Sequence, residues 1–163
     1  MLDYKVLMKL IEELLISVFF KKNKLSFIRE VNDIIQILEV QKYTFKIEGQ
    51  TAFTINIGLV LPNTFQKVFG KTVTPSVSEG VIYFNLGELL NDFNGRVINK
   101  HWVLKDEGKL KSELKSIFAE KVVPFFNSID TPDAIISFVE EKKIISKSTS
   151  SVKMQLDELK HQS

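Results

Sequence analysis

The sequence predicts an α+β fold: an antiparallel sheet of about five strands, with an N-terminal helix and C-terminal helices packed on one face. Three observations predict it. Apolar residues follow a helical period near the N-terminus, alternating and β-branched runs fill the middle of the chain, and helical periods return after Asp106. Strands that follow one another without intervening helices favour an antiparallel meander.

The first helix is predicted from a single apolar stripe. Its members recur at spacings of one, three and four residues: Leu2, Val6, Leu7, Leu10, Ile11, Leu14, Leu15, Val18 and Phe19. This spacing places them on one side of a helix that buries one face. We expect Lys21, Lys22 and Lys24 near its C-terminal end, where they complement the helix dipole. Asn23 is the expected left-handed stop.

Five runs are predicted as strands: Leu25–Val31, Ile34–Lys42, Thr51–Leu61, Val81–Gly87 and Val97–Leu104. The pair Asn32–Asp33 between the first two predicts a hairpin turn. The third run alternates over its whole length, and Pro62 ends it because proline cannot donate to a strand ladder. A short helical turn from Asn63 to Gly70 and a loop from Lys71 to Gly80 follow it.

Two helices are expected after the strands. Asp106 caps the first, which Pro124 should end or kink. The second runs from Pro132 to Lys143, with proline in its first turn. Residues 1–145 therefore form a single α+β domain. Residues 146–163 are rich in serine and lysine and are expected to form a polar, mobile tail with at most a weak helix.

Composition excludes several classes of function. The chain has no cysteine, which removes disulfides, thiolate metal ligands and thiol nucleophiles and suits a reducing cytoplasm. Twenty-two Lys and Arg against twenty Asp and Glu leave a net charge of +2, too small for the positive field of nucleic-acid binders. No apolar stretch approaches the roughly 20 residues of a membrane span. We expect a cytoplasmic protein with neither a membrane nor a nucleic acid as partner.

Residues that could carry chemistry are few. His101 and His161 are the only histidines, so no pair with metal-ligand spacing can be drawn and no metal is expected. No glycine-rich nucleotide motif occurs, and no cofactor is expected. His101 could act as a general base with a nearby carboxylate, but a single histidine on a strand is more often a structural or surface residue.

Polar side chains within the predicted strands are harder to explain. Uncharged amides and hydroxyls there need hydrogen-bond partners in the fold or a role in binding. Both interpretations stay open, and the candidate binding residues are Arg29, Gln36, Gln41, Thr54, Asn56, Asn85, His101 and the neighbouring Trp102. We expect them on the sheet face that the helices leave uncovered.

Several of these segments resemble the bacterial family catalogued as domain of unknown function 4304. The resemblance rests on the segments Phe20–Arg29, Ile35–Gln41 and Phe53–Gly58. The later Asn85-Leu86-Gly87-Glu88-Leu89 and Trp102 are similar to that family's R-I-G-x-L and tryptophan segments, with Asn85 where the family has Arg. The resemblance covers roughly residues 5 to 130. It implies a small bacterial α+β domain and no particular reaction.

Three hypotheses of function follow, of which the third, nucleic-acid binding through Lys21, Lys22, Lys24 and the tail lysines, predicts an affinity that falls steeply with salt. The first is a non-catalytic protein-binding module, analogous to immunity proteins that neutralise toxins, which recognises a protein through the polar strand face or the loop from Lys71 to Gly80. The second is a small enzyme that uses His101 with a nearby carboxylate, which requires a concave pocket holding both groups. The oligomeric state and the order of the strands are not specified by the sequence.

Overall fold

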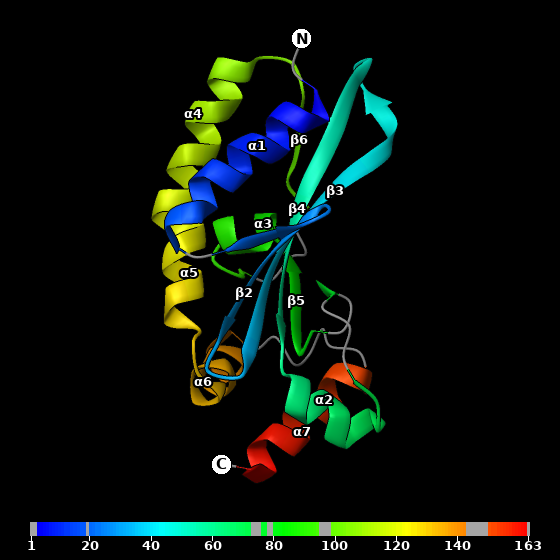
Figure 1. Cartoon of the computed structure of the whole chain (residues 1–163), viewed down its shortest axis with the longest axis vertical. Coiled ribbons are helices and arrows are strands. Elements are labelled where there is room, and N and C mark those ends of the chain that lie inside the picture. Colours follow the sequence, from blue (N-terminus) through cyan, green and yellow to red (C-terminus); the bar gives the residue numbers. More distant parts are fainter. Residues whose placement is uncertain are drawn as a thin grey trace.

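A six-stranded antiparallel sheet lies at the centre of the molecule, with α1, α4 and α5 against one of its faces (Figure 1). The computed structural model describes residues 3–18, 20–72, 76–77, 80–94, 99–142 and 150–162. The predicted α+β class and the predicted antiparallel sheet are therefore confirmed. No helix in these residues is both long enough and apolar enough to cross a membrane.

The strands are β1 (Lys21–Asn23), β2 (Ser26–Val31), β3 (Ile34–Ile47), β4 (Gln50–Val60), β5 (Ile82–Asn85) and β6 (His101–Val103). The helices are α1 (Tyr4–Leu15), α2 (Pro62–Phe69), α3 (Leu86–Leu90), α4 (Glu107–Ile117), α5 (Val123–Ser128), α6 (Pro132–Lys142) and α7 (Ser150–Gln162). A 3-10 turn follows α1, and a π-helical segment joins α4 to α5.

Strand order follows the sequence from β1 to β5, and all neighbours are antiparallel. β4 is the central strand, because β3 pairs along one of its edges while β5 and β6 share the other. On that shared edge Asn56 pairs with Asn85 of β5 and Thr54 pairs with His101 of β6. β6 therefore continues the line of β5, and the two strands meet beside the polar residues of β4.

The start of the sheet differs from the sequence prediction. Lys21 and Asn23 belong to β1, which pairs with β2 as a hairpin, and do not form the end of the first helix. The left-handed residue is Lys24, with φ of 55°, rather than Asn23. α1 ends earlier, at Leu15. Pairing with β2 overrides the weak local preference of a Lys-Lys-Asn sequence, which has no apolar alternation.

Two tight turns form the long hairpins. Asn32–Asp33, with φ of 47° and 63°, forms the predicted turn between β2 and β3. Glu48–Gly49, with φ of 50° and 74°, forms a second turn that the sequence analysis did not identify. β3 consequently continues past Lys42 to Ile47, and the ends of β3 and β4 form an arm that projects away from α6 and α7 (Figure 1).

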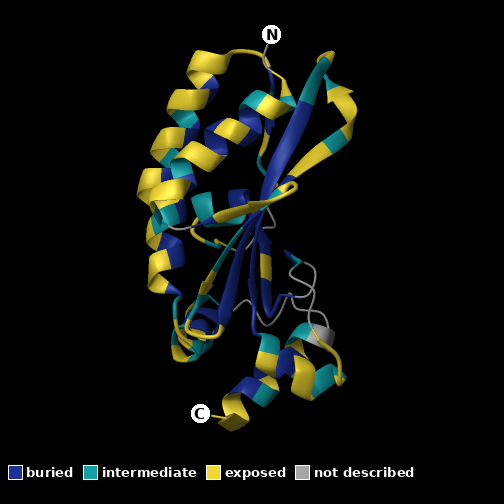
Figure 2. Ribbon diagram, viewed as in Figure 1, coloured by how far each residue is buried: buried dark blue, intermediate teal, exposed yellow. Residues whose placement is uncertain are grey.

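Both faces of the central strand are buried (Figure 2). On the face that α1, α4 and α5 cover, here the helix side, Phe53, Ile55 and Ile57 enter the main core. The opposite face, here the far face, holds a smaller cluster of Ile35, Ile37, Val60 and Val77. The sequence analysis expected the far face to be uncovered. The buried cluster shows that part of it is covered.

The helix that Asp106 caps, α4, ends at Ile117 and is followed without a break by the π-helical segment and α5, so the helical path changes type before Pro124. The Asp106 side chain accepts a hydrogen bond from the Lys109 backbone N–H at 2.9 Å, as predicted. Pro124 lies in the first turn of α5, directly after the π-helical segment Phe118–Val122. This change of helix type accommodates a residue that cannot donate a backbone hydrogen bond.

The C-terminal segment contains a 13-residue helix, where the sequence analysis expected at most a weak one. α7 packs against α2 and α6, and its Leu156 and Leu159 are buried. Apolar burial against two neighbouring helices compensates for the polar composition of this helix. Residues 146–149 and 163 of the predicted tail, residues 143–145 before it, residues 73–75 and 78–79 of the predicted loop, and residues 95–98 before β6 lie outside the described residues.

Candidate functional site

The predicted binding residues separate onto the two faces of the sheet. On the helix side lie Arg29, Gln36 and Trp102. On the far face lie Gln41, Thr54, Asn56, Asn85 and His101. The expectation of one shared polar face is therefore wrong. Side chains alternate along a strand, so two glutamines five residues apart on β3 point in opposite directions.

Arg29 is held by partners from three other segments. Its Nε donates to Oε1 of Gln36 at 2.7 Å, and its Nη1 donates to the Val18 carbonyl at 3.1 Å. Both terminal nitrogens also donate to Oδ1 of Asn127 at 3.2 Å, and the guanidinium lies 5.1 Å from the centre of the Phe20 ring. Burial lowers the pKa of Arg29, while the nearby Asp130 carboxylate opposes that shift.

Gln36 connects this arginine to the end of α5. Its Nε2 donates to the carbonyls of Phe126 at 2.7 Å and Ile129 at 2.9 Å. The amide is fully buried, and each of its hydrogen-bonding atoms has a partner. Gln36 and Arg29 thus join the sheet to the last turn of α5, which is a structural role. Sequence reasoning missed Asn127, because nothing in the sequence places it next to Arg29, 98 residues away.

Asn85 is the centre of the second polar network. Its Nδ2 donates to the Thr54 hydroxyl at 2.7 Å and to Oδ1 of Asn56 at 3.0 Å. Its Oδ1 accepts from the backbone N–H groups of Gly87 and Lys100, each at 2.9 Å. An amide offers two donors and two acceptor positions, so Asn85 is saturated. It is the residue that differs from the arginine expected from the family resemblance.

Each of the two side chains to which Asn85 donates makes a further hydrogen bond. Thr54 donates onward to the carbonyl of Lys100, and Asn56 donates to Oε1 of Gln41 at 2.9 Å. Asn85 also caps α3 in a reciprocal arrangement with Glu88. These bonds join β3, β4, β5 and β6 across one row of the far face. The polar residues of the strands are therefore paired within the fold, and Gln41 at the end of the row is exposed.

Two ionisable groups border this row. Burial raises the pKa of Glu39, and a hydrogen bond with the Asn56 side chain opposes the shift. Burial also raises the pKa of Tyr83, with the carboxylates of Glu39 and Glu88 adding to the effect. Both shifts favour neutral side chains on this part of the far face.

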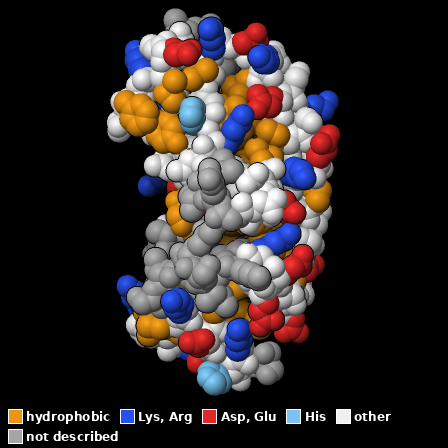
Figure 3. Space-filling model, turned by 180° about the vertical axis from the view of Figure 1, so that it is seen from behind, with side chains coloured by type: hydrophobic (Ala, Val, Ile, Leu, Met, Phe, Trp, Pro, Cys, Tyr) orange, Lys and Arg blue, Asp and Glu red, His pale blue; other side chains and the backbone are white. Residues whose placement is uncertain are grey.

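Two aromatic side chains, the half-buried Tyr43 and the exposed Phe45, continue from Gln41 along the arm. The rings of Tyr43 and Phe45 stack at 5.0 Å with an interplanar angle of 14°. The edge of His101 meets Tyr43 at 6.4 Å. Phe45 is 59% exposed. Figure 3, which shows the molecule from behind the view of Figure 1, has hydrophobic side chains beside a histidine in its upper half.

The aromatic pair lies at an irregularity of the sheet. Lys42 pairs with Phe53 and Lys46 with Thr51, so the three residues from Tyr43 to Phe45 lie opposite Ala52 alone. Bulges of this kind bend a strand and redirect its side chains. Sequence reasoning missed this pair because it ended the strand at Lys42; the signal that could have found it is the Glu-Gly pair that marks a later turn.

His101 does not have the geometry that the enzyme hypothesis requires. It is exposed, and the contact that the structure gives it is the Tyr43 ring. Within the described part of the chain, no carboxylate forms a hydrogen bond or ion pair with the imidazole. The same residues contain no group of three or more His, Asp or Glu side chains that could hold a metal ion.

Trp102 is a core residue rather than part of a binding surface. Its ring stacks on Phe53 at 5.5 Å, and only 5% of it is exposed. Its Nε1 donates to Oε1 of Glu113 at 3.1 Å, which connects β6 to α4. A buried indole commonly finds such a partner.

The comparison with known families matches the part of the chain that holds Arg29, Gln36 and Asn85, the central side chains of the two networks. The family described as a domain of unknown function (DUF4304) matches residues 11–128. The chain belongs to the DUF4304 family. Its family region extends from within α1 to the end of α5, so α6 and α7 lie beyond the matched residues. No curated protein and no solved structure matches the chain.

Proposed function

We propose that this DUF4304 protein is a non-catalytic protein-binding module. Its contact surface is the row formed by Gln41, Tyr43, Phe45 and His101, here called the arm surface, in which Tyr43 is half-buried and the other three are exposed. The observation that carries the proposal is the stacked pair of Tyr43 and Phe45, with Phe45 59% exposed on a projecting hairpin. Aromatic side chains are enriched at the centres of protein interfaces, where they contribute most of the binding energy.

The arm surface is preorganised for binding. Tyr43 is already in contact on both sides, with Phe45 and with His101, so little side-chain freedom remains to be lost on association. Loss of rotamer freedom is one of the main costs of forming an interface. Tyrosine and histidine also keep a polar edge, which suits a surface that is wet when free and buried when bound.

The network beneath the arm surface supplies a rigid base. Gln41 accepts from Asn56, and Asn56 accepts from the saturated Asn85. These bonds, the first partly buried and the second buried, fix the position of β3 relative to β4 and β5 where the arm begins. Interfaces built on rigid elements hold their contact residues more reproducibly than interfaces on loops. The polar strand residues of the far face therefore serve recognition indirectly, by positioning the arm.

An immunity protein that neutralises a toxin is one form that such a module takes. Support for this form is by analogy with other small domains and is independent of the contacts described above. The cysteine-free composition is consistent with action in the cytoplasm. Binding through the arm surface does not require the partner to be a toxin.

The proposal is tested by calorimetric titration of the purified protein with the products of the genes adjacent to its own. We expect one of them to bind, and Phe45→Ala to weaken that binding by about tenfold or more, as truncation of a hot-spot residue does. The matched control is Ile16→Ala, because Ile16 is another large apolar side chain, 66% exposed, in the 3-10 turn after α1.

Ile16→Ala should leave the affinity unchanged. Both substitutions remove exposed apolar atoms, so a general effect of surface hydrophobicity would change both affinities equally. A partner that binds wild type, Phe45→Ala and Ile16→Ala alike would contradict the arm surface. Failure of every adjacent gene product to bind at micromolar concentrations would count against the binding module itself.

A further inference from the structure

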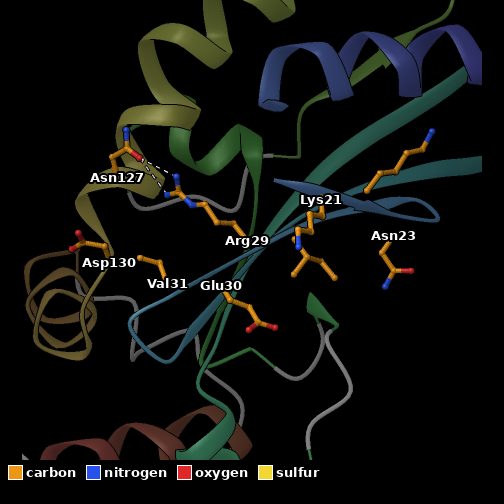
Figure 4. Close-up of a pocket in the computed structure, with 9 residues that line it drawn as sticks. Lys21, Asn23, Arg29, Glu30, Val31, Asn127 and Asp130 are labelled. Carbon is orange, nitrogen blue, oxygen red and sulfur yellow. Dashed lines mark hydrogen bonds between the residues drawn. The ribbon is translucent and has the colours of Figure 1, made fainter. Parts of the chain in front are cut away.

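A groove of about 800 Å³ lies at the β1–β2 edge of the sheet (Figure 4). β5 and β6 lie at the other edge. β1, β2 and the end of α5 surround the groove. Its lining residues are Lys21, Lys22, Asn23, Ile28, Arg29, Glu30, Val31, Asn127 and Asp130. The arm surface contributes none of them, so the groove is a separate feature of the molecule.

The groove follows a length of β2 that has a strand on one side only. β3 pairs with β2 over its whole length, from Ser26 to Val31. β1 pairs with β2 only as far as Ile28, through Lys21. From Arg29 to Val31 no strand in the described part of the chain pairs with the outer edge of β2. Alternate residues of an edge strand direct their backbone N–H and C=O groups outward, where they can pair with another chain.

The chain itself leaves this edge open by turning away before β1. The backbone N–H of Phe20 donates to the Leu15 carbonyl at 3.4 Å. The Phe20 ring packs into the helix side, 4.9 Å from the ring of Phe126 and below the guanidinium of Arg29. Because Phe20 enters the core, β1 cannot extend backward along β2 beyond Lys21.

Fixed side chains form the wall and the far end of the groove. The bonds from Arg29 to Asn127 hold the wall between β2 and α5, as the dashed lines in Figure 4 show. At the far end, Nδ2 of Asn32 donates to the Asp130 carbonyl at 3.0 Å. The groove is therefore held open by hydrogen bonds and does not need to be created by a ligand.

The charges of the groove are divided between its two ends. Asp130 lies near Arg29 and offsets its charge. At the β1 end, Lys22 forms an ion pair with Glu12 at 3.6 Å, at a solvent-exposed position. Glu30 adds a second carboxylate to the lining, but neither it nor any other carboxylate of the described residues forms an ion pair with Lys21. The positive charge of Lys21 is thus available to an acidic group placed at the β1 end.

We propose that this groove binds a short extended segment of another protein, which adds as a strand to the open edge of β2 and places an acidic side chain against Lys21. Three residues of open edge correspond to about 10 Å of strand. Backbone hydrogen bonds to β2 supply the affinity that does not depend on sequence, and the acidic side chain supplies specificity. Val31 and Ile28 offer apolar contact to the residues on either side.

The test is a selection of short random peptides displayed on phage against the whole chain, followed by fluorescence polarisation with the selected peptides. We expect the peptides to carry Asp or Glu next to β-branched residues. Lys21→Glu should weaken their binding by about tenfold or more, since attraction becomes repulsion. The matched control is Lys9→Glu, on the exposed side of α1, which makes the same change in net charge and should leave binding unchanged.

A second measurement tests strand addition without altering the protein. N-methylation of a selected peptide at alternate amides removes donors that would face β2, and one of the two alternating sets should abolish binding while the other is tolerated. Equal tolerance of both sets would overturn strand addition. Selected peptides without acidic residues, binding unaffected by Lys21→Glu, or no selected peptide at all would overturn the site. Displacement of the peptides by a single-stranded oligonucleotide would identify a nucleic acid as the occupant and would equally overturn it.

Discussion

The side-chain amide of Asn85 donates to the hydroxyl of Thr54 at 2.7 Å, at the place where β5 ends and β6 takes over the edge of β4. Together with the bond from the same amide to Asn56, it adds side-chain hydrogen bonds to the backbone pairing of β4 and β5. The same amide caps α3, so a single side chain determines where β5 stops and the following helix begins. The arrangement explains why a polar residue lies in the interior of the sheet.

Replacement of Asn85 should be strongly destabilising. Asn85→Ala leaves the N–H groups of Gly87 and Lys100 and the oxygen of Asn56 without partners, and each unsatisfied buried group costs about 1–3 kcal/mol. We expect a loss of about 2–4 kcal/mol in the free energy of unfolding, measured by urea denaturation. Asn94→Ala, at an exposed position, is the control and should change it by less than about 0.5 kcal/mol.

Substitution of Gln155 and of Gln36 by leucine should change the free energy of unfolding in opposite directions. Both side chains are fully buried, but neither Nε2 nor Oε1 of Gln155 has a hydrogen-bond partner. Gln155→Leu should therefore raise the free energy of unfolding by about 1 kcal/mol. Gln36→Leu should lower it by about 2–3 kcal/mol, because Arg29 Nε and the carbonyls of Phe126 and Ile129 lose their hydrogen-bond partner. A loss of stability in Gln155→Leu would contradict the description of α7.

Tyr4 predicts a loss of stability at alkaline pH. Burial, and secondarily the Glu39 carboxylate, raises the pKa of Tyr4 from 10.0 to about 12. Between these values the unfolded chain releases the phenolic proton and the folded chain keeps it, so the free energy of unfolding falls as pH rises. Denaturation midpoints measured across this range should decline less steeply in Tyr4→Phe. An equal decline would show that Tyr4 is not responsible.

The absence of a side chain at Gly58 allows Val77 to pack closely against β4. A Cβ at position 58 would lie 3.0 Å from the Val77 Cα and 3.1 Å from its Cγ1. Gly58→Ala should therefore cost about 1–3 kcal/mol through overpacking. Gly108→Ala in α4 meets only the Asp106 side chain, at 3.7 Å, and should be neutral or stabilising by up to about 1 kcal/mol. Equal effects of the two substitutions on the free energy of unfolding would contradict the close packing of Val77 against Gly58.

Much of the fold could be predicted because local patterns and tertiary packing agree. The alternation of β4, the Asn32–Asp33 turn and the cap at Asp106 all appear in the structure as the sequence predicts. β1 could not be predicted, since a Lys-Lys-Asn strand exists only through its pairing with β2. α7 was underestimated for a similar reason: its few apolar residues suffice only because α2 and α6 are there to receive them.

The candidate site was predictable only in part. Sequence reasoning selected Asn85, Asn56 and Gln41 as residues that need partners, and they bond to one another. It placed Gln36 on the same face, although strand alternation puts Gln36 and Gln41 on opposite faces. It also missed Tyr43 and Phe45, because their exposure depends on a bulge whose register only the paired strands define.

The most direct test of the proposed arm surface is a nuclear magnetic resonance map of the isotope-labelled protein as an interacting gene product is added. The account predicts that backbone amide signals from Gln41 to Lys46 and from His101 to Val103 shift or broaden first, since these segments carry or adjoin the aromatic row. Shifts confined to the exposed faces of α1 and α4, with the arm signals unchanged at saturation, would contradict it.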